Sequence, residues 1–361
     1  MKAERPSGGE RQMVPSGKPR SYYGLPIVKR PAWTWEVPWY LFTGGTAGGL
    51  AAVSILARWT GEAKLGRRAR RLALAGAVIS PVLLISDLGR PERFLNMLRV
   101  FRPTSPMSLG SWTLAGFGSS LGAAEMADIV GLPNVVVGTL EGTAGILGPI
   151  LANYTAVLLG DTANPIWRGG RSILPFVFSG SSMAAAGASL CVAGPTDEGV
   201  AARRMVVLGT IIEQASFLLM EQRLGPLAEP YHDGAAGRLV KLHRASSLAG
   251  ATLISTLGGR SRKAAILGGA LTLAGSAALR QCVYRAGFQS AADPRYLVDS
   301  QRGAATDTGA GTARSPDPST DDPSQEPRGQ DTQNWTIHPP GSGDGPTRAV
   351  LSRLPVGNLG G

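Results

Sequence analysis

The sequence predicts an all-α polytopic membrane protein, and two observations carry this prediction. Predominantly apolar stretches of about eighteen residues or more recur along the chain, which is the length that a helix needs to cross a hydrocarbon layer of about 30 Å. Most of the Lys and Arg residues lie in the short segments between these stretches, as in membrane proteins. The residues that follow the last stretch are polar and rich in Gly and Pro, so they lower the average hydropathy of the whole chain.

The domain organisation follows from this contrast in composition. Residues 1–34 form a basic N-terminal arm without the apolar centre of a cleavable signal peptide, so we expect the first helix to direct insertion. Residues 35–290 form the transmembrane domain. Residues 299–361 contain almost no aliphatic side chains that could form a core, which predicts a disordered C-terminal tail.

Eight membrane-spanning helices are expected in this domain. The seventh is short and contains Arg244, so a buried or re-entrant helix is an alternative there. Pro81 and Pro149 interrupt the second and the fourth. The predicted spans are residues 35–58, 69–87, 108–129, 134–160, 172–194, 204–223, 243–259 and 263–286.

A weak internal repeat predicts that the eight helices form two four-helix halves, at about 35–160 and 172–286. At a nearly constant offset, PWYLFTGG from residue 38 aligns with LPFVFSGS from residue 174, and RRLALAG from residue 70 aligns with RRMVVLG from residue 203. Because four is an even number, the halves would insert in the same orientation. Chance similarity between glycine-rich helices is the alternative. The glycines of span 1 are spaced for close helix packing.

An even number of spans places both termini on the same side of the membrane. The segments on that side, including 88–107, 161–171 and 224–242, hold most of the Lys and Arg residues. The positive-inside rule therefore predicts an inner-membrane protein with both termini in the cytoplasm. The basic segment 59–68 counts against this orientation.

Charge, cysteine and histidine content exclude several classes of function. The net charge of +11 is spread over short interhelical segments, so solvated loops explain it better than nucleic-acid binding does. Cys191 and Cys282 both lie in apolar runs and are too few for a cysteine-ligated cluster. The three histidines, His232, His243 and His338, are not placed to bind a haem. We therefore expect no cofactor that is bound covalently or through a metal ligand.

Acidic residues inside the predicted helices are candidates for proton transfer. Glu141 and Glu213 lie deepest, and a carboxylate at that depth needs a partner charge, a polar interior or a path to water. A protonated or hydrogen-bonded carboxyl that only contributes to packing is the alternative for both. Glu125 and Asp128, near a helix end, are more simply explained as solvated.

The charged stretch SDLGRPERF at 86–94 and the aromatic stretch WTWEVPWY at 33–40 lie on the same face of the predicted bundle. Asp87 is expected to end the second helix, and Arg90 and Arg93 follow where lipid headgroups or a partner protein would meet them. The aromatic residues fit an interfacial belt. Together with Glu36, they could hold a long-tailed lipid with a polar head.

At these residues the sequence resembles the NrfD/polysulfide reductase membrane-subunit family. The resemblance covers roughly residues 22–298. It is most specific in the second of the three matching segments, which are WEVPWYLFTGGTAGG, SDLGRPERFLNMLRVFRPTSPMSLGSW and ANYTAVLLGDTANPIW.

This resemblance implies a quinone-reactive or non-catalytic subunit of an oxidoreductase complex. It would exchange electrons between membrane quinone, an exchangeable substrate, and an iron–sulfur, ferredoxin-like subunit bound to a catalytic, molybdopterin-dependent subunit. It also implies quinone contacts at Trp35, Glu36, Tyr40 and Tyr154. Some family members have a His and an Asn near Trp35 and Glu36, and a Gly where this chain has Ala156.

The expected mechanism combines both sets of residues. Glu36 is the first choice as proton donor to the quinone, and Glu141 and Glu213 would extend the proton path to the opposite face. Asp87, Arg90 and Arg93 would shape the docking face for the iron–sulfur subunit. A secondary transporter built from two four-helix repeats is the alternative class, and a purely structural anchor without quinone is a third.

Overall fold

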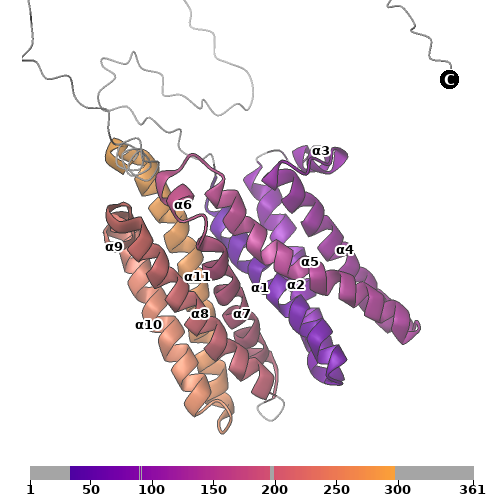
Figure 1. Ribbon diagram of the computed structural model, residues 1–361. Helices are drawn as coiled ribbons and strands as arrows, with labels where there is room; N and C mark the ends of the chain where they lie inside the picture. Colours follow the sequence, from indigo (N-terminus) through magenta and orange to yellow (C-terminus); the bar gives the residue numbers. More distant parts are fainter. Residues whose placement is uncertain (1–32, 89, 91, 196–198, 297–361) are drawn as a thin grey trace, which may run out of the picture. The chain divides into compact units, whose positions relative to one another are not determined.

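The computed structural model describes residues 33–88, 90, 92–195 and 199–296, and all of its long elements are helices (Figure 1). The predicted arm before residue 33 and the predicted tail lie outside these residues. The helices with 20 or more residues in this part of the chain are α1 (Glu36–Trp59), α2 (Ala63–Asp87), α4 (Pro106–Val130), α5 (Asn134–Gly160), α7 (Leu174–Ala193), α8 (Val200–Leu224), α10 (Gly234–Thr256) and α11 (Arg262–Ala292).

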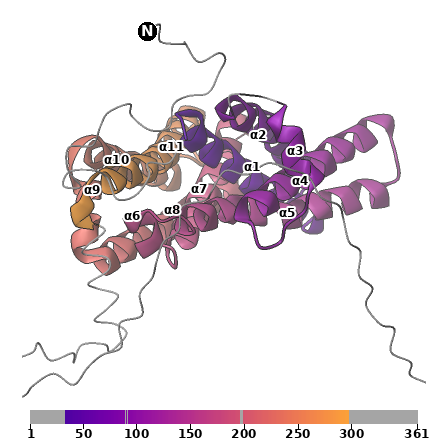
Figure 2. The same cartoon turned by 90° about the horizontal axis from the view of Figure 1, so that it is seen from above.

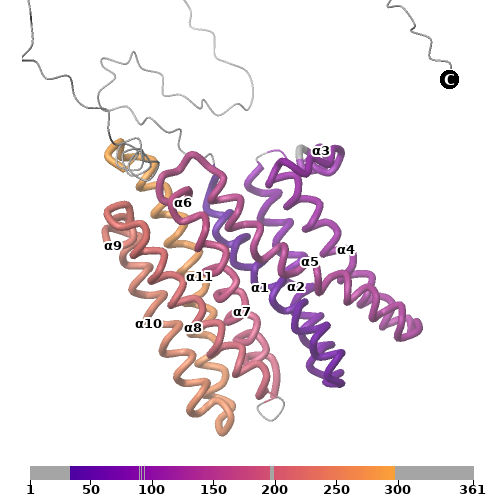
Figure 3. Tube along the Cα trace, viewed as in Figure 1, coloured from indigo at the N-terminus to yellow at the C-terminus, as the bar shows by residue number. Residues whose placement is uncertain are grey.

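Shorter helices lie in three of the connections between the long helices. They are α3 (Arg93–Arg99), α6 (Pro165–Gly169), the 3-10 helix η1 (Gly225–Ala228) and α9 (Glu229–His232). The turns that join α1 to α2, α4 to α5 and α10 to α11 are only a few residues long. They lie at the end of the bundle opposite to the shorter helices (Figure 3). Gly131, whose φ of 77° is left-handed, ends α4 in one of these turns.

Five helices, α1, α2, α5, α7 and α11, are long and apolar enough to cross a membrane. Both Pro81 and Pro149 lie inside such helices without ending them. The other three long helices have lower hydropathy. In α8 and α10 the cause is charge within the helix, such as Glu213 and Arg244.

Most predicted helix ends lie within four residues of the observed ones, but α2 begins six residues before its predicted span, α11 ends six residues after its span, and α10 differs most. The fourth predicted span has the same bounds as α5, and the third differs from α4 by two residues at its start and one at its end. The seventh was predicted to begin at 243, but α10 begins at Gly234. The early turns of α10 carry Arg238 and Lys241 on exposed positions, so their low hydropathy hid a regular helix.

The contacts among the first four long helices, here called the first group, have the same pattern as those among the last four, the second group. Helix α1 contacts α2 and α5, α4 contacts α5 and α2, and the same four relations hold for α7, α8, α10 and α11 in order. The two groups meet where α1 contacts α7, where α5 contacts α7 and where α1 contacts α11. Viewed from above, α1 and α7 lie between the outer helices α4 and α10 (Figure 2).

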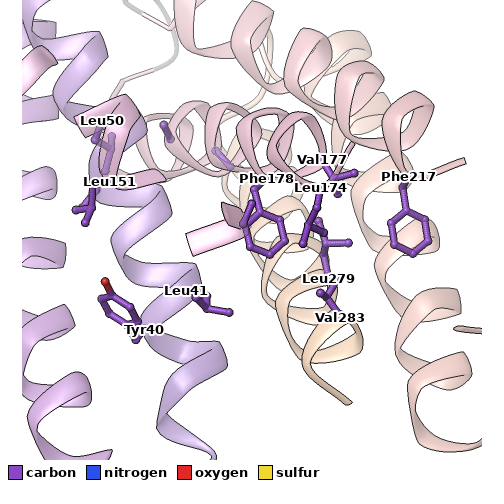
Figure 4. Packing of buried hydrophobic residues seen from close by; sticks show 14 of the residues in the cluster. Tyr40, Leu41, Leu50, Leu151, Leu174, Val177, Phe178, Phe217, Leu279 and Val283 are labelled. Carbon is purple, nitrogen blue, oxygen red and sulfur yellow. The ribbon is translucent and has the colours of Figure 1, made fainter. Parts of the chain in front are cut away.

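Helix α1 can approach several neighbours because glycines lie on its surface, as their spacing predicts. A Cβ atom on Gly48 would lie 2.2 Å from the carbonyl oxygen of Gly148 in α5, and one on Gly49 would lie 2.7 Å from that of Ser182 in α7. In Figure 4, Leu41 points from α1 toward α11, whereas Tyr40 points the other way. Helix α1 is therefore buried from both sides, because α2 and α5 of its own group cover one side and α7 and α11 of the second group cover the other.

Candidate functional site

Two carboxyl side chains meet at the start of α1. The hydroxyl of Thr34, just before this helix, lies within hydrogen-bond distance of Oε2 of Glu36 and 2.5 Å from Oδ1 of Asp87, the last residue of α2. The backbone N–H of Thr34 also donates to Oδ1 of Asp87, at 2.9 Å. All three side chains are half-buried. Thr34 therefore joins the carboxyl groups of two helices at one end of the bundle, here called the site end.

A pair of tyrosines lies one helical turn further along α1. Tyr40 is on the same face as Glu36 because the two are four residues apart, and its side chain is only 2% exposed. Its hydroxyl lies 2.5 Å from that of Tyr154 in the last turns of α5. In such a pair one hydroxyl donates to the other, so one hydrogen stays available for a further acceptor.

Glycine makes room for this tyrosine pair. Gly110 lies in the first turns of α4, within the SPMSLGSW stretch, and a Cβ atom there would lie 2.1 Å from Cε2 of Tyr154. No side chain larger than a hydrogen atom fits between α4 and the Tyr154 ring at this position. The backbone of α4 therefore acts as the wall against which Tyr154 lies.

Helices α11 and α6 hold the segment that precedes α1. The hydroxyl of Tyr284 in α11 lies 2.7 Å from the carbonyl oxygen of Trp33 and 2.9 Å from that of Thr34. The ring of Trp33 stacks on that of Trp167 in α6, with 5.6 Å between ring centroids. Trp167 donates in turn to the carbonyl oxygen of Val283, at 2.8 Å. The second group of helices thus contributes directly to the position of Thr34.

The residues expected at the membrane boundary lie at the site end. Trp35, 65% exposed, and Trp39, 40% exposed, fit the predicted aromatic belt, whereas Tyr40 does not because it is buried. Arg90 is exposed in the segment after α2, and α3 begins at Arg93.

Beyond the end of α11, Tyr296 donates to Glu229 in α9, at 3.0 Å, and burial raises the pKa of Tyr296 to about 12.

Glu141 lies toward the opposite end, inside a cluster of ion pairs. Its carboxylate accepts hydrogen bonds from Arg58, Arg70 and Ser54, at 3.1, 2.8 and 3.1 Å. Arg70 is 1% exposed and also binds Glu125 and Asp128 of α4. The expectation that these last two are solvated is wrong for Glu125, whose side chain is only 13% exposed. The cluster joins α1, α2, α4 and α5.

Glu213 has a different environment, in the middle of the second group. It is fully buried, and neither carboxylate oxygen has a hydrogen-bond partner. His243 Nδ1 lies 3.2 Å from Oε1, but this nitrogen also lies 3.0 Å from the carbonyl oxygen of Gly275, which can only accept a hydrogen. Arg280 acts on Glu213 electrostatically, and two of its own nitrogens, Nε and Nη1, also lack partners.

The structure brings together some of the residues that the sequence selected, in two pairs. At the site end, Glu36 and Asp87 meet at Thr34 and Tyr40 meets Tyr154, whereas Trp35 is exposed and Glu141 and Glu213 lie in separate clusters. Sequence analysis missed Thr34, Tyr284 and Gly110. Thr34 and Tyr284 act through contacts between distant parts of the chain, which the sequence alone does not show. Gly110 could have been selected, because it lies in the most specific of the three matching segments.

No group of three or more His, Cys, Asp or Glu side chains in the described residues is arranged to hold a metal ion. Cys191 and Cys282 are both buried, with free thiols.

The apolar helices, together with a carboxyl and tyrosine site at one end, define a multi-pass helical membrane protein. A sequence model described as polysulfide reductase matches residues 20–293. The chain belongs to this family, the NrfD/polysulfide reductase membrane subunits, which are parts of oxidoreductase complexes and associate with their other subunits. A search of curated proteins gave no match.

Proposed function

We propose that this chain is the quinone-reactive subunit of its complex. It exchanges electrons between the quinone pool and an iron–sulfur subunit, which is bound to a molybdopterin-type catalytic subunit. The observation that carries this proposal is the group of proton-carrying side chains at the site end, in a member of a family of oxidoreductase membrane subunits. A quinone takes up two protons with its two electrons, so its site needs donors of this kind.

The tyrosine pair and the carboxyl pair have separate tasks in this proposal. The available hydrogen of the Tyr40–Tyr154 pair binds and orients a quinone carbonyl oxygen. Glu36, one helical turn away on the same face, supplies a proton. Trp35, just before α1, is exposed at the same end of this helix and marks the membrane boundary where an isoprenoid tail would enter. The quinone is an exchangeable substrate, and no cofactor bound covalently or by a metal is needed in this chain.

The iron–sulfur subunit docks at the site end, because its terminal cluster has to lie near the quinone. Arg90 is exposed there, and Arg93 begins the next helix. Asp87, which belonged to the predicted docking set, lies beside Thr34 and Glu36 and so connects the docking face to the proton donor. The positive-inside rule places this end and both termini in the cytoplasm, with the chain in the inner membrane.

All eight long helices cross the membrane in this proposal, as two four-helix halves. The support is the contact pattern, which repeats between α1, α2, α4, α5 and α7, α8, α10, α11. In α8 and α10 the buried polar groups Glu213 and His243 face the protein interior, where lipid does not meet them, and Arg244 of α10 is paired with Glu221 of α8.

Protons reach the site from the opposite face through Glu213, along a path that passes beside Glu141. Of the two, Glu213 is better suited to carry a proton, because its oxygens lack hydrogen-bond partners and a buried water chain would satisfy them together with Arg280. Glu141 is held by two guanidinium groups and acts as a fixed charge beside the path.

The Glu36→Gln variant tests the proposal in the intact complex. Loss of the carboxyl proton should lower quinol-linked electron flow by about a hundredfold, while electron transfer between the catalytic and iron–sulfur subunits stays unchanged with an artificial dye. Thr46→Val is a matched control, because the Thr46 hydroxyl binds only the Phe42 carbonyl oxygen of its own helix. Electron flow at the wild-type rate in Glu36→Gln would remove this residue from the donor role.

A secondary transporter is the second candidate, and the buried Glu213 is the observation that favours it. The two candidates differ in what they move. Purified protein in vesicles would couple solute uptake to a proton gradient if it were a transporter, without any partner subunit. An intact complex that reduces quinone and shows no such uptake supports the redox role.

A further inference from the structure

The Thr34 hydroxyl has only one hydrogen, and this limits the protonation states that the two neighbouring carboxyl groups can have. Its oxygen lies within hydrogen-bond distance of both Glu36 and Asp87. Two ionised carboxylates are acceptors only, so they would compete for that hydrogen and repel each other across one oxygen atom. Both contacts are satisfied when one carboxyl group carries a proton and donates it to the Thr34 oxygen.

The remaining contacts decide which carboxyl group carries the proton. Oδ1 of Asp87 accepts the backbone N–H of Thr34 in addition to the hydroxyl. Asp87 thus has two donors on the same oxygen. Among the described residues no backbone N–H donates to Glu36, so Glu36 is the group that can hold the proton and donate it to Thr34. In this arrangement, Oε2–H of Glu36 donates to Oγ1 of Thr34, and Oγ1–H of Thr34 donates to Oδ1 of Asp87.

We propose that Glu36 and Asp87 share one proton through Thr34, and that Thr34 is the positioning residue that couples them. Tyr284 and Arg285 of α11 are further titratable groups near this point, and Tyr284 holds Thr34 in place by donating to its carbonyl oxygen. The resting state of this group needs no quinone. Only the destination of the proton rests on the function proposed above.

The same arrangement reloads Glu36 after it has given its proton away. Asp87 takes a proton from water at the membrane boundary. The Thr34 hydroxyl then passes its own hydrogen to Glu36 while its oxygen accepts the proton of Asp87. Afterwards Glu36 and Thr34 are again protonated and Asp87 is charged, so the net change is one proton moved from water to Glu36.

Infrared difference spectra of the intact complex test the shared proton. At neutral pH, the spectrum of the wild type minus that of the Glu36→Gln variant should show the C=O band of one protonated carboxyl group. The wild type minus Asp87→Asn should show the same band, because without the charged partner Glu36 accepts the Thr34 hydrogen and ionises. Two independent acids would give two different bands, and two independent carboxylates would give none. Either of these results overturns the proposal.

The role of Thr34 itself has its own test. Thr34→Val removes the hydroxyl with little change in shape and should shift the carboxyl band and slow quinol-linked turnover at least about tenfold. Thr34→Ser should restore both, and Thr46→Val should leave both unchanged. An unshifted band in Thr34→Val, in protein that unfolds at the wild-type temperature, would exclude the bridge. The band is measured without quinone, so failure of the quinone role would leave this result standing.

Discussion

The position of Tyr154 depends on a residue that carries no side chain. Because the backbone of α4 at Gly110 touches the Tyr154 ring, any added atom would move the ring and separate its hydroxyl from that of Tyr40. Small displacements of a group that orients a substrate have large kinetic effects. If the tyrosine pair binds quinone as proposed, the identity of residue 110 affects that binding, although this residue has no functional group of its own.

Gly110→Ala tests this dependence. The Cβ atom displaces the Tyr154 ring, so we expect kcat/KM for quinol to fall about ten- to a hundredfold in the intact complex. Gly118→Ala in the same helix is the control, because no atom lies within 4 Å of its added Cβ, and replacing a helical glycine there should stabilise α4 by about 0.5–1 kcal/mol. Unchanged quinol kinetics in Gly110→Ala would contradict the role given to the tyrosine pair.

At this scale the sequence predicted residue types but not their partners. Trp35, Glu36, Tyr40 and Tyr154 could be selected because they lie in recognisable motifs. Nothing local connects Thr34 to Asp87, which is 53 positions away, or to Tyr284, which is 250 positions away. Such contacts arise only when the helices are packed.

At the scale of the helices, the ion-pair cluster around Arg70 determines how α1, α2, α4 and α5 are joined. Its guanidinium group pairs with carboxylates from α4 and α5, and its side chain is 2% exposed. Removing one partner from a buried group of charges costs much more than removing an exposed pair. Arg70 and its neighbour Arg71, 64% exposed and also paired with Glu125, form a natural comparison.

Arg70→Met should lower the free energy of unfolding by about 3–5 kcal/mol, because it leaves buried carboxylates without their cation. Arg71→Met should change it by less than about 1 kcal/mol. Thermal unfolding of the purified protein in detergent would measure both. Equal effects of the two substitutions would mean that the buried cluster does not hold these four helices together.

Helix positions were the most predictable feature, because hydropathy reports them directly. The bounds of α5 agree in full, and Glu141 and Glu213 are buried as their positions suggested. The start of α10 was missed for a physical reason. Exposed charges such as Arg238 and Lys241 lower the hydropathy of its first turns, whereas Ala236 and Val240 in the same turns are buried, so a segment with low hydropathy still packs as a regular helix.

On the scale of the whole molecule, the proposed function requires the site end to bind both a quinone and a protein partner. Reversing the charge at Arg90 and Arg93 together, each to Glu, should release the iron–sulfur subunit, measured by co-purification with the tagged chain. Arg204→Glu with Arg260→Glu is the matched control, since both residues are exposed at the end of the bundle opposite to the site end, Arg204 near the start of α8 and Arg260 in the turn between α10 and α11. Undiminished co-purification of the first variant would place the docking face elsewhere.

Labelling with a photoreactive azidoquinone tests the central claim most directly. In the intact complex, illumination should attach the label to the peptides that contain residues 33–40 and 154, and excess unlabelled quinone should prevent it. The Tyr154→Phe variant should label more weakly. Displaceable labelling confined to the outer faces of α8 and α10, or no displaceable labelling at all, would contradict a quinone site between α1, α2 and α5.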